Sequence, residues 1–153
     1  ETGGGRIIGE ACHFVDISRF LTGSPIIDIQ AVSMKLAEGV EDCHDTATLT
    51  ITFENGSIAS IHYFANGHQT FQKERIEVFQ SGKTMVLDNF RRIEGYGLAG
   101  FNKKTFKQNK GQQECCNAFV DALKEGKAAP VAYGELMEVS RAVIKAWGQL
   151  LTQ

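Results

Sequence analysis

The pattern of apolar and polar positions predicts helices at both ends of the chain and strands between them. Residues 46–53 alternate strictly, with four threonines on one side and Ala47, Leu49, Ile51 and Phe53 on the other. This period of two is typical of a half-buried strand. The dipeptide Asn55-Gly56 favours a tight turn, so it predicts a hairpin into a second strand over residues 57–65.

The first helix is expected from about residue 6 to residue 22, where Gly23-Ser24-Pro25 would end it. The glycine- and lysine-rich stretch 95–111 has no periodicity and predicts a loop. The other expected elements are a strand over 26–36, a polar loop over 37–45, strands over 75–80, 84–88 and 91–94, and amphipathic helices over 112–124 and 135–151.

Strands grouped in the middle, short hairpin links and flanking helices predict an α+β fold. We expect an open, mostly antiparallel or mixed β-sheet with helices packed on one face. The threonine-lined second face has two interpretations, because it could be solvated or could pack against another subunit. We favour the second, a homodimer or larger assembly formed through the sheet.

The first predicted helix carries a polar stripe on an otherwise apolar surface. At about 100° per residue, Arg6, Glu10, His13 and Asp16 fall within a stripe roughly 120° wide. Ionisable groups on a largely buried helix are costly unless they are paired or used. His13 is therefore either a core histidine with one hydrogen bond, oriented by Asp16, or a functional group that faces a cleft.

Length and composition predict one ordinary domain of 153 residues, with 42% hydrophobic and 22% charged residues. A net charge of -2 gives no reason to expect nucleic acid or an anionic membrane as a partner. No apolar run is long enough to span a bilayer, and no signal peptide is visible. Because the chain begins at Glu1 without a methionine, we expect a piece of a longer protein. Because no signal peptide is visible, we expect that protein to be cytoplasmic.

The cysteines do not have the spacing of a metal site, and we expect reduced thiols and no bound metal. They are Cys12, Cys43, Cys115 and Cys116. The sequence also lacks a Gly-x-Gly-x-x-Gly turn between a strand and a helix, so it predicts no dinucleotide-binding fold.

Residues 3–16 resemble the opening of the C-terminal domain of the glucose–fructose oxidoreductase, inositol dehydrogenase and MocA family. That opening typically has glycines, then Asp-x-Gly-x-His, then an aspartate three residues after the histidine. Here Gly9 replaces the first aspartate and Ala11 replaces the glycine of the motif. Further segments resemble a branch often fused to a zinc-type alcohol dehydrogenase module, namely residues 53–57, 63–67, 73–79 and 87–92.

The resemblance implies a fold like the C-terminal domain of glyceraldehyde-3-phosphate dehydrogenase-type oxidoreductases. It also implies a nicotinamide-dependent oxidoreductase that acts on a secondary alcohol of a sugar, cyclitol or nucleotide-sugar. NAD or NADP would be bound mainly by an N-terminal Rossmann domain that is absent from this chain, so this fragment alone is expected to be inactive. Gly4 and Gly5 are the candidate cofactor contacts of this chain.

In this interpretation, His13 is the catalytic residue that accepts the hydroxyl proton, and Asp16 sets its tautomer. Arg6 and Glu10 would bind substrate hydroxyls, or would instead form an ion pair within the helix. Tyr63 and Asn66, with His68 nearby, would line the same cleft, or would simply lie in a surface loop.

Two other functions are compatible with the sequence. The first is a catalytically idle oligomerisation or scaffold domain of the same fold, which Gly9 in place of the family's acid favours. The second is biliverdin-reductase-like chemistry, which typically does without a sugar-binding polar stripe.

Overall fold

The computed structural model describes residues 5–35, 44–104 and 107–153. The chain forms two compact units, each built around its own sheet. The first unit comprises Glu1–Gly67 and Val131–Gln153, and the second comprises His68–Pro130. No helix in the described part of the chain is long and apolar enough to cross a membrane.

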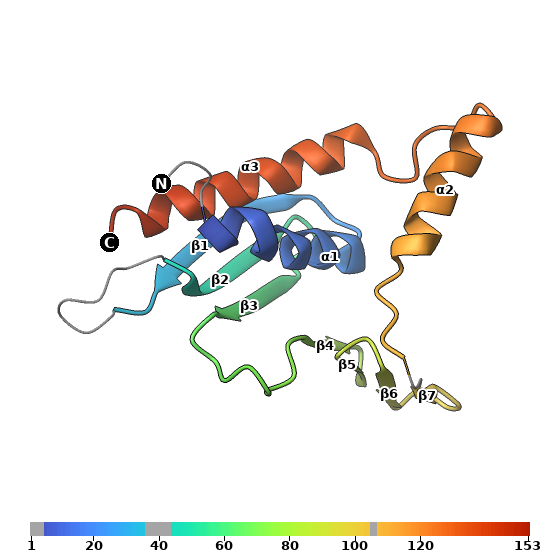
Figure 1. Ribbon diagram of the computed structural model, residues 1–153, viewed down its shortest axis with the longest axis horizontal. Coiled ribbons are helices and arrows are strands. Elements are labelled where there is room, and N and C mark those ends of the chain that lie inside the picture. Colours follow the sequence, from blue (N-terminus) through green and yellow to red (C-terminus); the bar gives the residue numbers. More distant parts are fainter. Residues whose placement is uncertain (1–4, 36–43, 105–106) are drawn as a thin grey trace. The chain divides into compact units, whose positions relative to one another are not determined.

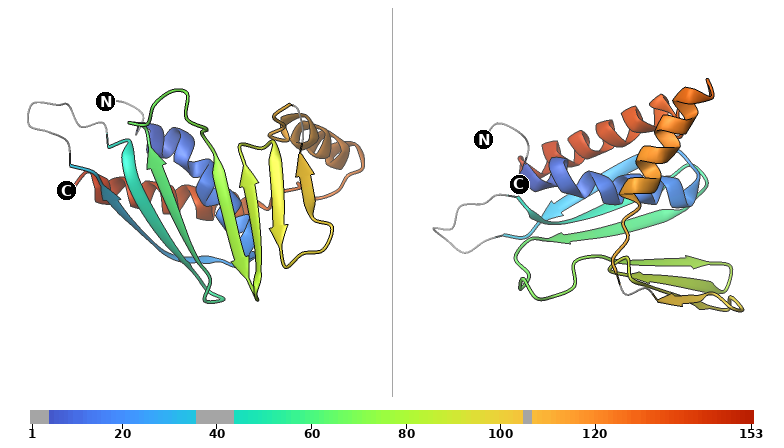
Figure 2. Two further views of the ribbon diagram at one scale, coloured as in Figure 1. Left: turned by 90° about the horizontal axis from the view of Figure 1, so that it is seen from below. Right: turned by 45° about the vertical axis from the view of Figure 1, so that its right-hand side comes forward.

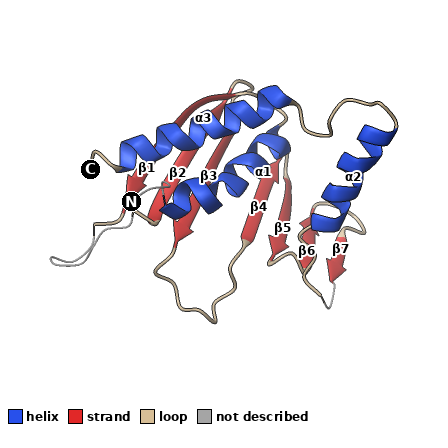
Figure 3. Ribbon diagram, turned by 45° about the horizontal axis from the view of Figure 1, so that its top comes forward, coloured by secondary structure: helices blue, strands red, loops and turns tan. Residues whose placement is uncertain are grey.

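The first unit is an antiparallel sheet with helices on one face (Figure 1). Its strands are β1 (Ile26–Ser33), β2 (Thr46–Phe53) and β3 (Ile58–Phe64), in that spatial order. A π-helical turn, η1 (Ile7–Ala11), leads into α1 (Cys12–Thr22). Helices α1 and α3 (Tyr133–Leu150) lie on the same face of this sheet (Figure 3). The predicted α+β class with helices on one face is confirmed.

The core lies between that face and the helices. The apolar side of β2 is confirmed as its centre, since Ala47, Leu49, Ile51 and Phe53 are at most 2% exposed. These side chains join buried residues of every other element of the unit, which include Ile7, Ala11, Val15, Ile29, Ala31, Ile61, Val139, Val143, Ala146 and Leu150.

The other face of this sheet, here called the open face, is exposed and mixed in character. It comprises Val32, Thr48, Thr50, Thr52, Ile58, Ser60, His62 and Phe64. Val32, Ile58 and Phe64 are 64%, 73% and 53% exposed. His62 Nδ1 lies 3.0 Å from Thr48 Oγ1, and the centroid of its ring lies 5.6 Å from that of Phe64, with the two rings tilted by 34°. Only Thr46, at the edge of the predicted threonine row, is buried.

The first helix differs from the regular helix that the sequence predicts. Residues 7–11 form a π-turn, a rare widening of the helix that a regular period of 3.6 does not predict. The expected burial on most sides was wrong for the end of α1, where Phe20 and Leu21 are 80% and 42% exposed. The helix ends, as predicted, at Gly23, whose φ of +60° and N–H bonds to Arg19 O and Phe20 O are typical of a left-handed cap.

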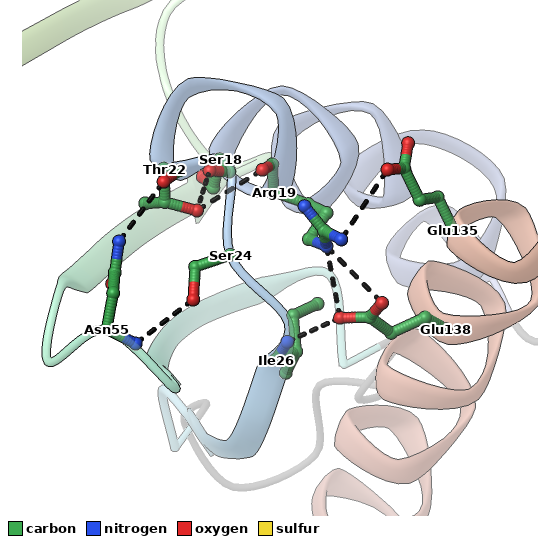
Figure 4. Close-up of polar contacts among 8 residues, drawn as sticks. All are labelled: Ser18, Arg19, Thr22, Ser24, Ile26, Asn55, Glu135 and Glu138. Atoms are coloured by element: carbon green, nitrogen blue, oxygen red, sulfur yellow. Dashed lines mark hydrogen bonds and ion pairs between the residues drawn. The ribbon is translucent and has the colours of Figure 1, made fainter. Parts of the chain in front are cut away.

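Two polar links hold the end of α1 in place (Figure 4). Arg19 Nε lies 3.2 Å from Glu138 Oε1 on α3, and this glutamate also accepts a hydrogen bond from the N–H of Ile26. On the other side, Asn55 Nδ2 donates to Thr22 O over 3.2 Å. Gly56, with a φ of +82°, completes the predicted turn between β2 and β3.

The second unit is a separate antiparallel sheet followed by a helix (Figure 2). Its strands are β4 (Arg75–Gln80), β5 (Lys83–Asp88), β6 (Arg92–Tyr96) and β7 (Asn102–Lys104), and its helix is α2 (Gln112–Lys124). The predicted loop over 95–111 was wrong in part, because it contains the end of β6 and the whole of β7. The bounds of α2 are as predicted, but all of its residues except Ala122 are exposed and none is buried.

Candidate active site

The structure places the predicted polar stripe on the accessible side of η1 and α1. Arg6, Glu10, His13 and Asp16 are all exposed, whereas Ile7, Ala11 and Val15 on the other side of the helix are fully buried. His13 is therefore not a core histidine. The π-turn sits inside this stripe, and such turns are frequent at functional sites.

Glu10 is tied to the sheet by Tyr63. Tyr63 is the penultimate residue of β3, and its Oη donates a hydrogen bond to Glu10 Oε2 over 3.1 Å. Burial, this hydrogen bond and the charge of Glu10 together raise the pKa of Tyr63 to about 12. The phenol is therefore neutral at ordinary pH and acts as a fixed donor to the carboxylate.

Arg6 pairs with Asp45, and the alternative ion pair with Glu10 is not formed in the described structure. Arg6 Nε lies 3.7 Å from Asp45 Oδ2. Sequence reasoning missed Asp45 because it stands in a polar turn. Asp45 could have been found from the register of the β2–β3 hairpin, in which Ala47 pairs with Tyr63 and the N–H of Ala65 donates a hydrogen bond to Asp45 O. The structure thus brings Arg6, Glu10, Tyr63 and Asp45 close together.

His13 and Asp16 share the helix face without a hydrogen bond between them in the described structure. Cys12 directly precedes His13, and the pKa of its thiol is raised first by burial and also by the charges of Asp16 and Glu10. The thiols of Cys12, Cys115 and Cys116 are free. Cys43 lies outside the described residues.

The remaining candidates have other hydrogen-bond partners. Asn66 Nδ2 donates to Met34 Sδ over 3.7 Å, and His68, in the second unit, lies 2.9 Å from Thr70 Oγ1. Gly5, with a φ of +59°, directly precedes Arg6, and Gly4 lies outside the described residues. Within the described ranges, no group of three potential metal ligands comes together.

The described residues do not fit a nicotinamide dinucleotide by themselves. Every strand pair among them is antiparallel, whereas a dinucleotide site needs parallel strands joined through a glycine-rich turn and a helix. The described part of this chain therefore contains no Rossmann-type dinucleotide site.

Comparison with known proteins decides the family. Residues 1–86, which contain the polar stripe, Asp45 and Tyr63, match the profile of the GFO/IDH/MocA C-terminal domain. The chain belongs to this family.

Individual relatives agree with the assignment of this GFO/IDH/MocA C-terminal domain. The uncharacterized oxidoreductase YrbE of Bacillus subtilis is 34% identical over 98 residues, which are 60% of this chain and 27% of that protein. UDP-N-acetylglucosamine 3-dehydrogenase GnnA from Acidithiobacillus ferrooxidans shares the fold, with a TM-score of 0.70 and 18% identity. The match covers 90% of this chain and 44% of GnnA.

An oxidoreductase from Agrobacterium radiobacter, solved in complex with NAD+, L-tartaric acid and magnesium, is similar to the same extent. Its TM-score is 0.70 at 18% identity, over 93% of this chain and 46% of that one. The GFO/IDH/MocA domain described here thus spans less than half the length of each of these relatives.

Proposed function

We propose that this domain forms the substrate side of the active site in a longer, nicotinamide-dependent oxidoreductase. The substrate would be a secondary alcohol of a sugar, cyclitol or nucleotide-linked sugar. One observation carries the proposal: His13 is exposed on a polar stripe beside a carboxylate, Glu10, that Tyr63 holds in place. Membership of the family and the oxidoreductase relatives support it.

The residues of this chain would do two things in the reaction. A neutral His13 would accept the proton of the substrate hydroxyl, and the charge of Asp16 on the same helix would stabilise the imidazolium that forms. Glu10 would accept hydrogen bonds from other hydroxyls of the substrate, and Arg6 would donate to them. A second domain would hold the NAD or NADP, so we assign proton transfer and hydroxyl recognition alone to this chain.

We also infer that the open face is a subunit contact of the intact protein, giving a homodimer or tetramer. Val32, Ile58 and Phe64 expose apolar side chains on the two edge strands, β1 and β3, of one sheet. Apolar side chains gathered on one exposed face favour contact with another protein surface.

His13→Ala and His13→Gln in the full-length protein test the catalytic role. Loss of a general base lowers kcat/KM by about 10²–10⁴-fold, and an exposed side chain changes the free energy of unfolding by about 0.5 kcal/mol or less. Exogenous imidazole should restore part of the lost turnover of His13→Ala. Turnover within a few-fold of wild type in both variants removes the assignment.

The alternative is an idle scaffold, and the glycine at position 9 is the observation that favours it. A Cβ added at Gly9 meets no atom within 4 Å, so Gly9→Asp fits the fold without strain from packing. If the domain is a scaffold, the full-length wild type oxidises no sugar with either coenzyme, yet still self-associates. Sugar oxidation by the wild type that is lost in His13→Ala excludes this alternative.

A further inference from the structure

The candidate active site carries an excess of negative charge. Among the described residues, three carboxylates (Glu10, Asp16 and Asp45) accompany a single guanidinium, that of Arg6. With His13 neutral, one positive and three negative charges leave a net charge of -2.

Two neighbouring side chains respond to this charge. The pKa of the Cys12 thiol is raised by burial and then by the charges of Asp16 and Glu10. The pKa of Tyr63 is raised by burial and by Glu10, with Asp45 acting in the same direction and Arg6 opposing. Both groups are thus harder to deprotonate, since another negative charge beside the cluster is unfavourable.

The hydrogen-bonding capacity of the cluster points the same way. Asp45 Oδ2 lies 3.7 Å from Arg6 Nε and balances the charge of the guanidinium, so Arg6 is not an unpaired cation that would attract an anionic ligand. Tyr63 occupies Glu10 Oε2 and leaves Glu10 Oε1 as an acceptor. A carboxylate can only accept hydrogen bonds, so Glu10 and Asp16 suit hydroxyl donors and repel a ligand carboxylate.

We propose that the sugar ring or cyclitol oxidised at this site carries no carboxylate, and that Glu10 and Asp16 select against uronic acids. The substrate class is therefore a neutral polyhydroxylated ring, either free or linked to a group that lies away from the stripe. This inference rests on the proposed function and adds the chemical nature of the ring.

Matched pairs that differ by one carboxylate test the selection in the full-length protein. The pairs are glucose with glucuronate, and UDP-N-acetylglucosamine with its uronic acid. Both kcat/KM and the dissociation constant are compared within each pair. The dissociation constant can be measured without turnover, so the test does not depend on turnover alone. We expect the neutral member to be favoured at least about tenfold, because like charges within the site repel.

Glu10→Gln keeps an oxygen that can accept the bond from Tyr63 and removes one negative charge. It should reduce the preference for the neutral ring by about three- to tenfold. Glu54→Gln is the matched control, because Glu54 follows the other end of β2 from Asp45. The eight residues of β2 span about 25 Å, well beyond a Debye length of about 10 Å, so this variant should leave the preference unchanged.

Cys12 provides a second readout that needs no substrate. The pH dependence of alkylation of the Cys12-containing peptide, followed by mass spectrometry, gives the pKa of its thiol. Glu10→Gln should lower this pKa and Glu54→Gln should not. Equal kcat/KM and dissociation constants for both members of each pair overturn the inference, and so does an unchanged pKa of Cys12 in Glu10→Gln. Unaffected turnover in the His13 variants overturns the proposed function instead.

Discussion

Tyr63 and Glu10 join the end of β3 to the π-turn that opens the first helix. The phenol oxygen donates to the carboxylate over 3.1 Å, across 53 residues of sequence. This bond fixes Glu10 relative to the sheet rather than relative to its own helix. Glu10, three residues before His13, is thus held by the strand hairpin, and substitutions at Tyr63 should affect both stability and substrate recognition.

Tyr63→Phe should lower the free energy of unfolding at neutral pH by about 1 kcal/mol, because a hydrogen bond to a partly exposed carboxylate is lost. Its pH dependence follows from a pKa raised from 10.0 to about 12 on folding. The contribution of this phenol to stability is complete below pH 10 and is lost as the pH rises through 12. Tyr63→Phe should therefore lack the phenolate absorbance step near pH 12.

Tyr133→Phe is the matched control for this titration, because Tyr133 is 75% exposed on the first turn of α3. Its titration should retain the step that belongs to Tyr63. A step that survives in Tyr63→Phe would contradict the contact with Glu10.

The link between Arg19 and Glu138 should be the most sensitive ion pair of the first unit. The side chain of Arg19 is 12% exposed, and its Nε lies 3.2 and 3.3 Å from the two oxygens of Glu138. Arg19→Met should cost roughly 2–4 kcal/mol of unfolding free energy, since it leaves a partly buried carboxylate without its cation. Chemical denaturation measures the loss.

Glu135 offers the comparison for this ion pair. Its carboxylate lies 3.5 Å from Arg19 and its side chain is 45% exposed. Glu135→Gln should cost at most about 0.5 kcal/mol, because exposed ion pairs contribute little. Equal losses for Arg19→Met and Glu135→Gln would show that burial does not decide the strength of this pair.

Two glycine-to-alanine substitutions should change the free energy of unfolding in opposite directions. Gly23 adopts a φ of +60° at the end of α1, so Gly23→Ala should cost roughly 1–2 kcal/mol. Gly148 lies within α3, where a Cβ meets no atom within 4 Å, so Gly148→Ala should stabilise by about 0.5–1 kcal/mol. Thermal unfolding of both variants checks the pair, and a stabilising Gly23→Ala would contradict the left-handed cap.

Charged residues on the open face should weaken self-association of the full-length protein. Ile58→Lys and Phe64→Lys place a charge on an apolar part of that face, and the measured mass in solution should fall to that of a smaller species. Ile144→Lys is the control, because Ile144 is 60% exposed on α3, a helix on the opposite face of the sheet. Light scattering gives the masses, and an unchanged mass in both open-face variants argues against the proposed contact.

Strong periodicity made much of the fold predictable from the sequence. The strict alternation of residues 46–53 predicted β2 with its observed bounds, and the amphipathic pattern of 112–124 did the same for α2. Strand β7 was missed because its three residues, Asn102–Lys104, are polar and exposed. Without an apolar side to bury, an edge strand has no pattern that distinguishes it from a loop.

The candidate site was predictable where it depended on helix geometry. The stripe from Arg6 to Asp16 lies on one exposed side as expected, but the π-turn was not foreseen, since it leaves no periodic signal in the sequence. The pairing of Arg6 with Asp45, rather than with Glu10, depends on the hairpin register. Contacts between elements need that register, which a helical period alone does not provide.

The first unit is assembled from two stretches that are separated in sequence by the second unit, because α3 completes a core begun by η1 and the β1–β3 sheet. Leu150, three residues before Gln153, is fully enclosed in that core. During synthesis on the ribosome, this hydrophobic surface stays open until α3 has emerged, whereas residues 68–130 are available to fold earlier. Nascent chains stalled before α3 should therefore be the species that chaperones retain and proteases remove.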